Sequence, residues 1–411
     1  MIRSEQIIAD GRRHATAATW GAAAVMVAIS VVRLAPLIAS PHRHPTTSTV
    51  GTDFATTIWG PNVLVAEGAN PWDIHNSVPR FGVFPSSPLW PSGYGFGRVF
   101  SAMGYPSALM IWLLVSLVVI VLAARMIALS FDVDARLAWL IGLGVLMSPV
   151  ARYNLQLGQS GAGLMAITGF FATLHRRPPG WSGRAHLVGF GALALFLLPK
   201  PTFALAALAT ELAYRRRADW CAAAAALLAL IGGLVMVVIM WRSHLAVGDV
   251  LASYRATARV LGAAPVNRIA GDRVDLLSLL APSPVVDLLV IGACVVALVA
   301  LSRWQKPTTF ERLLIGTTVA TLFTYHHMYD TTVLLTLALV SVVLWRGMRA
   351  WIVMVALIAS SWLYRLRAIE RPISSLTGID QFPLEARLVF VIGTGLLIDA
   401  VWRISSGSGR S

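Results

Sequence analysis

Four groups of polar residues in this chain have side chains that could do chemistry. They are Asp53, the segment 152–159, Lys200 and the segment 325–330, which reads Tyr-His-His-Met-Tyr-Asp. A carboxylate can take a proton from a hydroxyl group, and cations can hold a phosphate and stabilise the charge that it gains as it leaves. One carboxylate with several cations is therefore the set expected for a group transfer in which a phosphate departs.

The individual roles follow from side-chain type. Asp53 is the candidate general base. The candidate contacts to a phosphate are basic or imidazole side chains, namely Lys200, Arg152, His326 and His327. The candidate contacts to a ligand rich in hydroxyl groups are two amides and an indole ring, namely Gln159, Asn154 and Trp59.

Each of these residues also has a structural interpretation, which stays open at this point. Asp53 could cap a short helix that begins at Gly51-Thr52-Asp53, and Lys200 could extend to a lipid head group. The His326/His327 pair could pack, or bind a metal with Asp330, although adjacent helical residues point about 100° apart. The tryptophans could form an interfacial belt, namely Trp59, Trp72, Trp90 and Trp112.

The composition predicts an integral membrane protein. Hydrophobic residues make up 57% of the 411 residues and charged residues only 13%, so a soluble fold would expose far too much apolar surface. The formal net charge is +14, and the arginines lie between apolar segments without forming a continuous basic stripe. Anionic lipid head groups explain that pattern, and nucleic acid is not an expected partner.

Apolar segments recur along the whole chain, and we expect about twelve transmembrane helices. The fold class expected is therefore an all-α polytopic membrane protein, with residues 1–411 forming a single membrane domain. Short basic connections fall on one side together with the N-terminal arginines, and the positive-inside rule makes that side the cytoplasm. The segments lie near 17–39, 106–128, 136–150, 160–175, 186–199, 202–214, 219–241, 284–302, 309–325, 331–345, 350–364 and 386–403.

The three longest connections, 40–105, 242–283 and 365–385, are then extracytoplasmic loops, and the first of them carries Asp53. All four polar groups reach the same external face in this topology.

Two prolines interrupt the apolar run around Lys200, so we interpret residues 183–214 as a short or re-entrant helical hairpin with Lys200 at its tip. The segment Asp132-Val133-Asp134 lies on a predicted cytoplasmic turn, and we interpret it as solvated.

Five short motifs, in order along most of the chain, resemble the GT-C membrane glycosyltransferases, and among them family 87. That family includes polyprenyl-phosphate-mannose-dependent α-mannosyltransferases and an arabinofuranosyltransferase. The chain departs from the family pattern at Trp72, Ser86-Ser87 and Tyr325, which leaves the sugar open. The motifs are Asp53 followed by Glu67-Gly68-Ala69-Asn70-Pro71-Trp72, Phe84-Pro85 to Pro91, Leu157-Gly158-Gln159, Leu198-Pro199-Lys200-Pro201, and His326-His327 with Asp330.

The resemblance implies a GT-C-like bundle with elaborated extracytoplasmic loops and an inverting, metal-independent transfer. Asp53 would act as the base, and His326 or His327 would lie near the donor phosphate. The expected partners are a polyprenyl-phosphate sugar as donor, a glycolipid or cell-envelope glycan as acceptor, and membrane lipids; no cofactor is expected. The expected location is the cytoplasmic membrane, with the active site on its extracytoplasmic face. Mannose is the favoured sugar, and arabinofuranose is the alternative.

Two other classes of protein stay open. A transporter or flippase of lipid-linked sugars would also use broken helices and a lysine at membrane depth, although the sequence has no detectable inverted repeat. An acyl- or phosphotransferase would use His326 or His327 as base or nucleophile and would not need Asp53.

Replacing Lys200 by alanine tests the predicted phosphate contact. We expect the apparent affinity for a polyprenyl-phosphate donor to fall, because a charge-assisted contact to the phosphate is lost. Donor titration of the wild-type and Lys200→Ala proteins measures the change. An unchanged apparent KM for the donor would remove Lys200 from the site.

Overall fold

The computed structural model describes residues 51–73, 98–159, 161–176 and 331–345, together with several shorter stretches, of which 244–250 is the longest. Within these residues every regular element is a helix. The prediction of an all-α chain is therefore confirmed for the described part of the protein.

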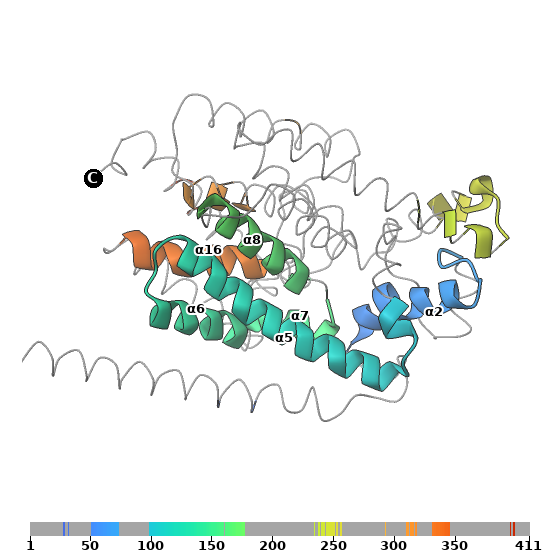
Figure 1. Cartoon of the computed structure of the whole chain (residues 1–411), viewed down its shortest axis with the longest axis horizontal. Coiled ribbons are helices and arrows are strands. Elements are labelled where there is room, and N and C mark those ends of the chain that lie inside the picture. The colour runs from blue at the N-terminus through green and yellow to red at the C-terminus, as the bar shows by residue number, and fades with distance from the viewer. Residues whose placement is uncertain are drawn as a thin grey trace, which may run out of the picture.

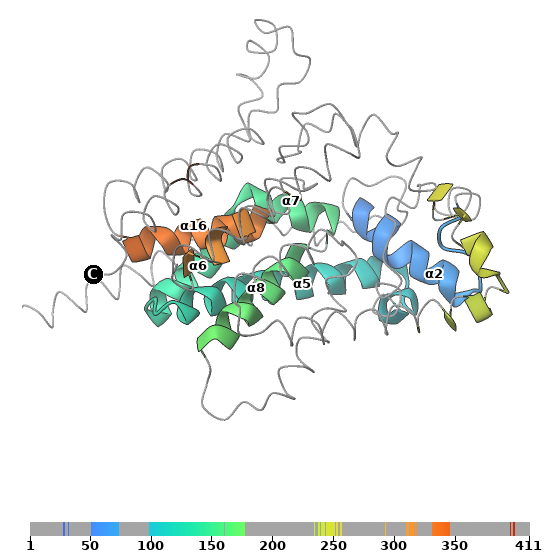
Figure 2. The same cartoon turned by 90° about the horizontal axis from the view of Figure 1, so that it is seen from above.

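One helix, α5, lies at the centre of the described structure (Figure 1). It packs against α6 on one side and α8 on another, and α16 contacts all three (Figure 2). A shorter helical segment made of η1 and α2 lies beside the first turns of α5. The elements are η1 (Phe54–Trp59), α2 (Gly60–Ala66), α5 (Tyr105–Ser130), α6 (Ala135–Met147), α7 (Pro149–Leu157), α8 (Gly161–Arg176) and α16 (Thr332–Trp345).

The length of α5 fits a bilayer. Among the described residues it is the one helix long and apolar enough to cross a membrane unaided. Its 26 residues rise about 39 Å at about 1.5 Å per residue, compared with a hydrocarbon core of about 30 Å. Helices α6 and α7 meet the same criterion together, as a pair bent by 58°.

Four of the predicted spans are found as helical segments. These are 106–128, 136–150, 160–175 and 331–345, and the other predicted spans lie wholly or mostly outside the described residues. The segment 136–150 differs from the prediction, because it is broken at Ser148. Ser148 is extended, with ψ 147°, as residues before proline usually are. Its Oγ then accepts the backbone N–H of Ala151 at 3.1 Å and caps a new helix, α7.

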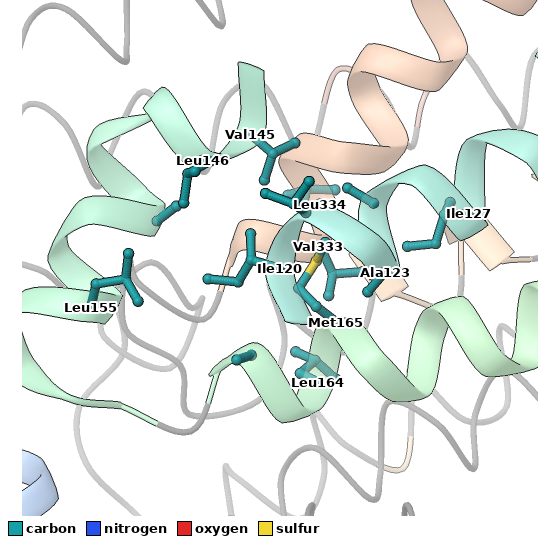
Figure 3. Packing of buried hydrophobic residues seen from close by; sticks show 14 of the residues in the cluster. Ile120, Ala123, Ile127, Val145, Leu146, Leu155, Leu164, Met165, Val333 and Leu334 are labelled. Carbon is teal, nitrogen blue, oxygen red and sulfur yellow. The ribbon is translucent and has the colours of Figure 1, made fainter. Parts of the chain in front are cut away.

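The helices pack through small residues and branched apolar side chains. Ile120, Ala123 and Ile127 of α5 face Met165 of α8 and Val333 of α16 (Figure 3). Gly142 of α6 lies so close to α5 that a Cβ atom there would be 2.8 Å from the carbonyl oxygen of Val121. Small residues at such contacts let helix backbones approach closely, which is how helices associate where no water is present to drive packing.

A second face of α5 is exposed and apolar. Met110, Leu114, Val118, Leu122 and Met126 are all exposed and recur every four residues, so they form one ridge along the helix. We call these five residues the α5 ridge. A row of large apolar side chains on a soluble surface would be unfavourable, whereas it suits a helix in contact with lipid.

The two ends of the helical core are distinct. The first turn of α5 contacts the segment that carries Asp53, because the Tyr105 hydroxyl donates to the carbonyl oxygen of Gly51 at 3.1 Å. At the far end of α5, the ring of Phe131 packs edge-on against Phe310, with centroids 4.9 Å apart. We call these the Asp53 end and the Phe131 end of the core.

Helices α8 and α16 start at the same end. The Thr336 hydroxyl donates to the sulfur of Met165 at 3.6 Å, and each residue lies one turn into its own helix. Since α8 begins at Gly161, two residues after Gln159, the N-terminus of α16 also lies toward the Asp53 end.

Replacing Gly142 by alanine tests the close packing of α6 on α5. The added methyl group meets backbone that cannot move independently, so we expect a loss of about 1 to 3 kcal/mol of stability. Thermal unfolding in detergent should show a melting temperature several degrees below that of the wild type. Gly104→Ala is the matched control, because a Cβ atom there meets nothing within 4 Å. Equal melting temperatures for both variants would contradict this packing.

Candidate functional site

Asp53 lies in the first turn of a helical segment that begins directly after Gly51. Gly51 has a φ of 75°, and its carbonyl oxygen accepts the N–H of Ala55 at 2.9 Å, the first bond of the segment. The segment passes through the wide π turn η1 and continues as α2 without a break. Asp53 is half-buried. The stretch predicted to be a loop therefore presents its carboxylate from a helix, which is more rigid than a loop.

Two threonine hydroxyl groups donate hydrogen bonds within the wide turn. In a π turn each N–H pairs one residue further back than in an α-helix. The Thr56 hydroxyl donates to the carbonyl oxygen of Thr52 at 3.0 Å, and the Thr57 hydroxyl donates to that of Asp53. These hydroxyl groups supply donors to the carbonyls of the first turn, a known way in which threonine alters a helix.

Gly51 is fixed from two directions. Its N–H donates to the carbonyl oxygen of Gln156 in α7 at 2.7 Å. Its own carbonyl oxygen accepts the Tyr105 hydroxyl from α5. A Cβ atom on Gly51 would be 2.6 Å from Leu109 and 2.8 Å from the Tyr105 oxygen. Glycine is therefore required here both by its positive φ and by the lack of space.

The end of α7 places the second functional side chain. The helix ends at Gly158, which has a left-handed φ of 69°. The N–H of Gln159 then donates back to the carbonyl oxygen of Asn154 at 2.9 Å, which is the usual closure of a helix by glycine. This turn leaves Gln159 buried beside the start of η1.

Asp53 and Gln159 meet at this point. The Gln159 side-chain amide Nε2 donates a hydrogen bond to Oδ2 of Asp53. The two residues are 106 positions apart in the chain, so the contact is made by the fold and not by local sequence. A charge-assisted hydrogen bond of this kind orients the carboxylate as well as binding it.

A cluster of aromatic residues packs beside the contact between Asp53 and Gln159. Phe54 is fully buried, and its ring stacks on Trp112 with centroids 5.5 Å apart. The Trp112 indole N–H donates to the carbonyl oxygen of Gly158 at 3.0 Å. The ring of Phe100 lies nearly perpendicular to both rings and packs against them. Asp53 and Gln159 are thus each adjacent in sequence to a residue held in this aromatic cluster.

The capping interpretation expected a short helix that begins at Gly51-Thr52-Asp53; that helix is present, but Asp53 does not cap it. Asp53 has helical backbone angles, and its side chain makes no capping hydrogen bond to η1. Its Oδ2 instead accepts the Gln159 amide.

The interpretation of the tryptophans as an interfacial belt is also wrong for two of them. Trp72 and Trp112 are buried, with 2% and 4% of their surface exposed. Trp59 is half-buried; its indole N–H donates to the carbonyl oxygen of Met103 at 3.1 Å, and its ring packs edge-on against Tyr105. Trp90 lies outside the described residues.

Of the other predicted site residues, two lie within the described part of the chain and three lie outside it. Arg152 is exposed on α7. Asn154, on the same helix, is buried. Its backbone carbonyl oxygen accepts the N–H of Gln159 and so closes the turn at Gly158. Lys200, His326 and His327 lie outside the described residues, so the predicted convergence is found for Asp53 and the segment 152–159 only.

The first and second long connections touch each other. The Asn70 side-chain amide donates to the Ser253 hydroxyl at 2.9 Å. Gly68, with a φ of 77°, lies so close to Arg242 that a Cβ atom would be 2.8 Å from its carbonyl oxygen. The contact brings these parts of the two connections together, and the extracytoplasmic position of 40–105 and 242–283 stays a prediction.

The acidic turn between α5 and α6 agrees with the solvated interpretation. Asp132 and Asp134 are exposed, and Oδ1 of Asp134 accepts the N–H of Arg136 at 2.9 Å and caps α6. Within the described ranges, no three His, Cys, Asp or Glu side chains gather closely enough to hold a metal ion. The expected independence from metal stays a prediction.

Sequence reasoning missed the residues that hold the site together. Tyr105 was not singled out, although it donates to the backbone at Gly51. Both turns have a sequence signal, which is a glycine one or two residues before the polar residue. The two segments are Gly51-Thr52-Asp53 and Gly158-Gln159.

Comparison of the chain with known protein families, with curated proteins and with solved structures gives no match.

Replacing Gly158 by alanine tests the turn that positions Gln159. The new Cβ atom would be 2.6 Å from Cβ of Phe54, in a backbone conformation that alanine disfavours. We expect a loss of about 1 to 3 kcal/mol, since strain and crowding act together. Thermal unfolding in detergent measures the loss. Gly248→Ala is the control, because a Cβ atom there meets nothing within 4 Å; equal stability of the two variants would show that this turn is not constrained.

Proposed function

We propose that the protein is a polytopic enzyme of the cytoplasmic membrane that transfers a monosaccharide from a polyprenyl phosphate to a hydroxyl group of a glycolipid or cell-envelope glycan. Mannose is the favoured sugar, and arabinofuranosyl transfer by the same mechanism is the alternative. The transfer inverts the anomeric carbon, with Asp53 as general base on the extracytoplasmic face. The five motifs that resemble family 87 of the GT-C glycosyltransferases support this class.

The observation that carries the proposal is the contact between Asp53 and Gln159. A general base must hold its carboxylate in one position relative to the acceptor hydroxyl, because misplacement by about 1 Å can cost about a hundredfold in rate. The Gln159 amide holds one carboxylate oxygen from a turn that is itself fixed by Trp112. This degree of positioning is more than a solvated surface carboxylate requires.

The proposed reaction needs one base. The acceptor oxygen attacks the anomeric carbon while its proton passes to the Asp53 carboxylate. The bond from the anomeric carbon to the phosphate oxygen breaks, and the phosphate keeps the bonding electrons. Because polyprenyl phosphate is a stable anion, no second carboxylic acid is needed to protonate it, unlike the leaving group in glycoside hydrolysis.

The departing phosphate requires positive charge. Arg152 is exposed on α7, the helix that leads to Gln159, so its guanidinium is accessible to a ligand. His326 and His327 come a few residues before α16, whose N-terminus lies toward the Asp53 end. Lys200 is the third proposed contact to the phosphate. These groups would stabilise the charge that develops on the phosphate in the transition state.

The membrane location is supported by α5. The helix is long enough to cross a bilayer and carries an exposed apolar ridge. A donor with a polyprenyl chain would reach Asp53 from within the lipid phase, which explains a reactive group at the end of a membrane helix.

One feature of the fold favours a second candidate, a flippase of lipid-linked sugars. The 58° bend between α6 and α7 is the kind of helix break that transporters use at their binding sites. A flippase would move the lipid across the bilayer without breaking the bond between sugar and phosphate, so product analysis separates the two functions.

Replacing Asp53 by asparagine tests the proposed base. Purified protein is incubated with labelled polyprenyl-phosphate mannose or arabinose and extracted envelope glycolipids, and label is followed into product. Asparagine keeps the size of the side chain but cannot accept the proton, so we expect transfer to fall about a hundred- to ten-thousand-fold. Asp132→Asn is the matched control, because Asp132 is an exposed carboxylate in the turn after α5, at the opposite end of that helix.

The same assay distinguishes the alternatives. Full transfer by the Asp53→Asn protein would exclude Asp53 as the base. Absence of transfer by folded wild-type protein, with labelled lipid crossing the bilayer intact, would favour the flippase.

Addition of a chelator should leave the rate unchanged, and inhibition reversed by Mg²⁺ or Mn²⁺ would contradict the expected independence from metal.

A further inference from the structure

We propose that the Phe131 end of α5 binds an anionic phospholipid of the cytoplasmic leaflet through Arg125, Trp139 and the α5 ridge. The inference rests on the membrane location given under the proposed function, and it does not depend on sugar transfer.

Arg125 and Trp139 form a preorganised cationic surface. The guanidinium carbon of Arg125 lies 4.7 Å from the centroid of the Trp139 ring. Arg125 is on α5 and Trp139 is on α6, so the pair bridges two packed helices. Stacking on an indole ring fixes the plane of a guanidinium while its edge stays available for bidentate hydrogen bonds to a phosphate.

The hydrogen bonding of Arg125 is incomplete in the described part of the protein. Its Nε is buried and has no acceptor within hydrogen-bond distance. The side chain as a whole is half-buried. Arginine is the side chain best suited to bind phosphate through two parallel N–H groups. An oxyanion beside this partly exposed side chain would pair with its charge.

The α5 ridge provides the apolar half of the site. Its last residue, Met126, is the direct neighbour of Arg125 in the sequence, and Leu122 lies one turn before it. A lipid whose phosphate meets Arg125 can lay its acyl chain along the ridge. Trp139 is 38% exposed beside this position, and indole rings favour the depth of lipid head groups.

The position along α5 identifies the leaflet. Arg125 follows Tyr105 by twenty residues, which corresponds to about 30 Å along a helix and so to the thickness of the hydrocarbon core. Since Tyr105 contacts the segment of Asp53, a lipid at Arg125 lies in the opposite leaflet. It cannot be the sugar donor that reacts at Asp53.

Among the described residues, the charges that follow α5 directly are Asp132, Asp134 and Arg136, and all three are exposed. Arg176, the last residue of α8, and the buried Glu311, next to Phe310, also belong to the Phe131 end of the core. Oδ1 of Asp134 accepts the N–H groups of Arg136 and Leu137 at the start of α6. We expect the attraction of an anionic head group to depend on Arg125, whose guanidinium stacks on the partly exposed Trp139. A zwitterionic lipid offers the same phosphate but adds a cation, so it should bind less well.

Native mass spectrometry of the purified full-length protein tests the site. The protein is equilibrated with phosphatidylglycerol and phosphatidylcholine of identical acyl chains, and the lipids that stay bound are counted. Wild-type protein should retain phosphatidylglycerol several-fold more than phosphatidylcholine. Arg125→Gln should remove most of that preference. Arg98→Gln is the matched control, because it makes the same charge change at an exposed arginine that precedes the N-terminus of α5.

A second variant keeps the test decisive if Arg125→Gln does not fold. Trp139→Leu removes the stacking surface and keeps an apolar side chain and the charge of Arg125, so the preference should fall by a smaller factor. Equal retention of the two lipids by the wild type, or an unchanged preference in both variants, would overturn the proposal. Competition by polyprenyl phosphate for the Arg125-dependent site would also overturn it, because the occupant would then be the donor class. Retained lipid preference without sugar transfer would contradict only the proposed function.

Discussion

The close approach of two glycine turns determines the geometry of the candidate site. The turn at Gly158 lies so near the helix start at Gly51 that a Cβ atom on Gly158 would be 3.4 Å from the Cα atom of Gly51. A Cβ atom on Gly158 would also be 2.6 Å from Cβ of Phe54, and one on Gly51 would be 2.6 Å from Leu109 of α5. Because Asp53 follows one turn and Gln159 follows the other, a side chain at either glycine would disturb the backbone that positions one of the two partners.

Helix α5 sets the distance between these turns. Tyr105, Leu109 and Trp112 have the spacing i, i+4, i+7 and therefore lie on one face of the helix. Tyr105 donates to the carbonyl of Gly51, Trp112 donates to that of Gly158, and Leu109 fills the space beside Gly51. The same helix continues into the core with α6 and α8. The position of the carboxylate is thus tied to the packing of the whole bundle.

The sequence was informative where polarity contrasts with an apolar background. Asp53 and Gln159 were predicted because charged and amide side chains are costly at membrane depth, and the positions of four helices followed from hydropathy. It was misleading for Trp112, since an indole at a helix end looks the same whether it faces lipid or packs on Phe54. The break at Ser148 and the wide turn after Asp53 depend on individual hydrogen bonds, which a hydropathy pattern does not encode.

The wide turn η1 makes the length of its segment part of the site. One residue of an α-helix corresponds to about 100° of rotation about the axis. The residue that a π turn adds therefore sets the angular phase between Asp53 and everything that follows, including Asn70, which meets Ser253. If the six residues of η1 formed an ordinary helix instead, the carboxylate would be rotated by about a quarter turn relative to α2. Spacing at this point matters as much as residue identity.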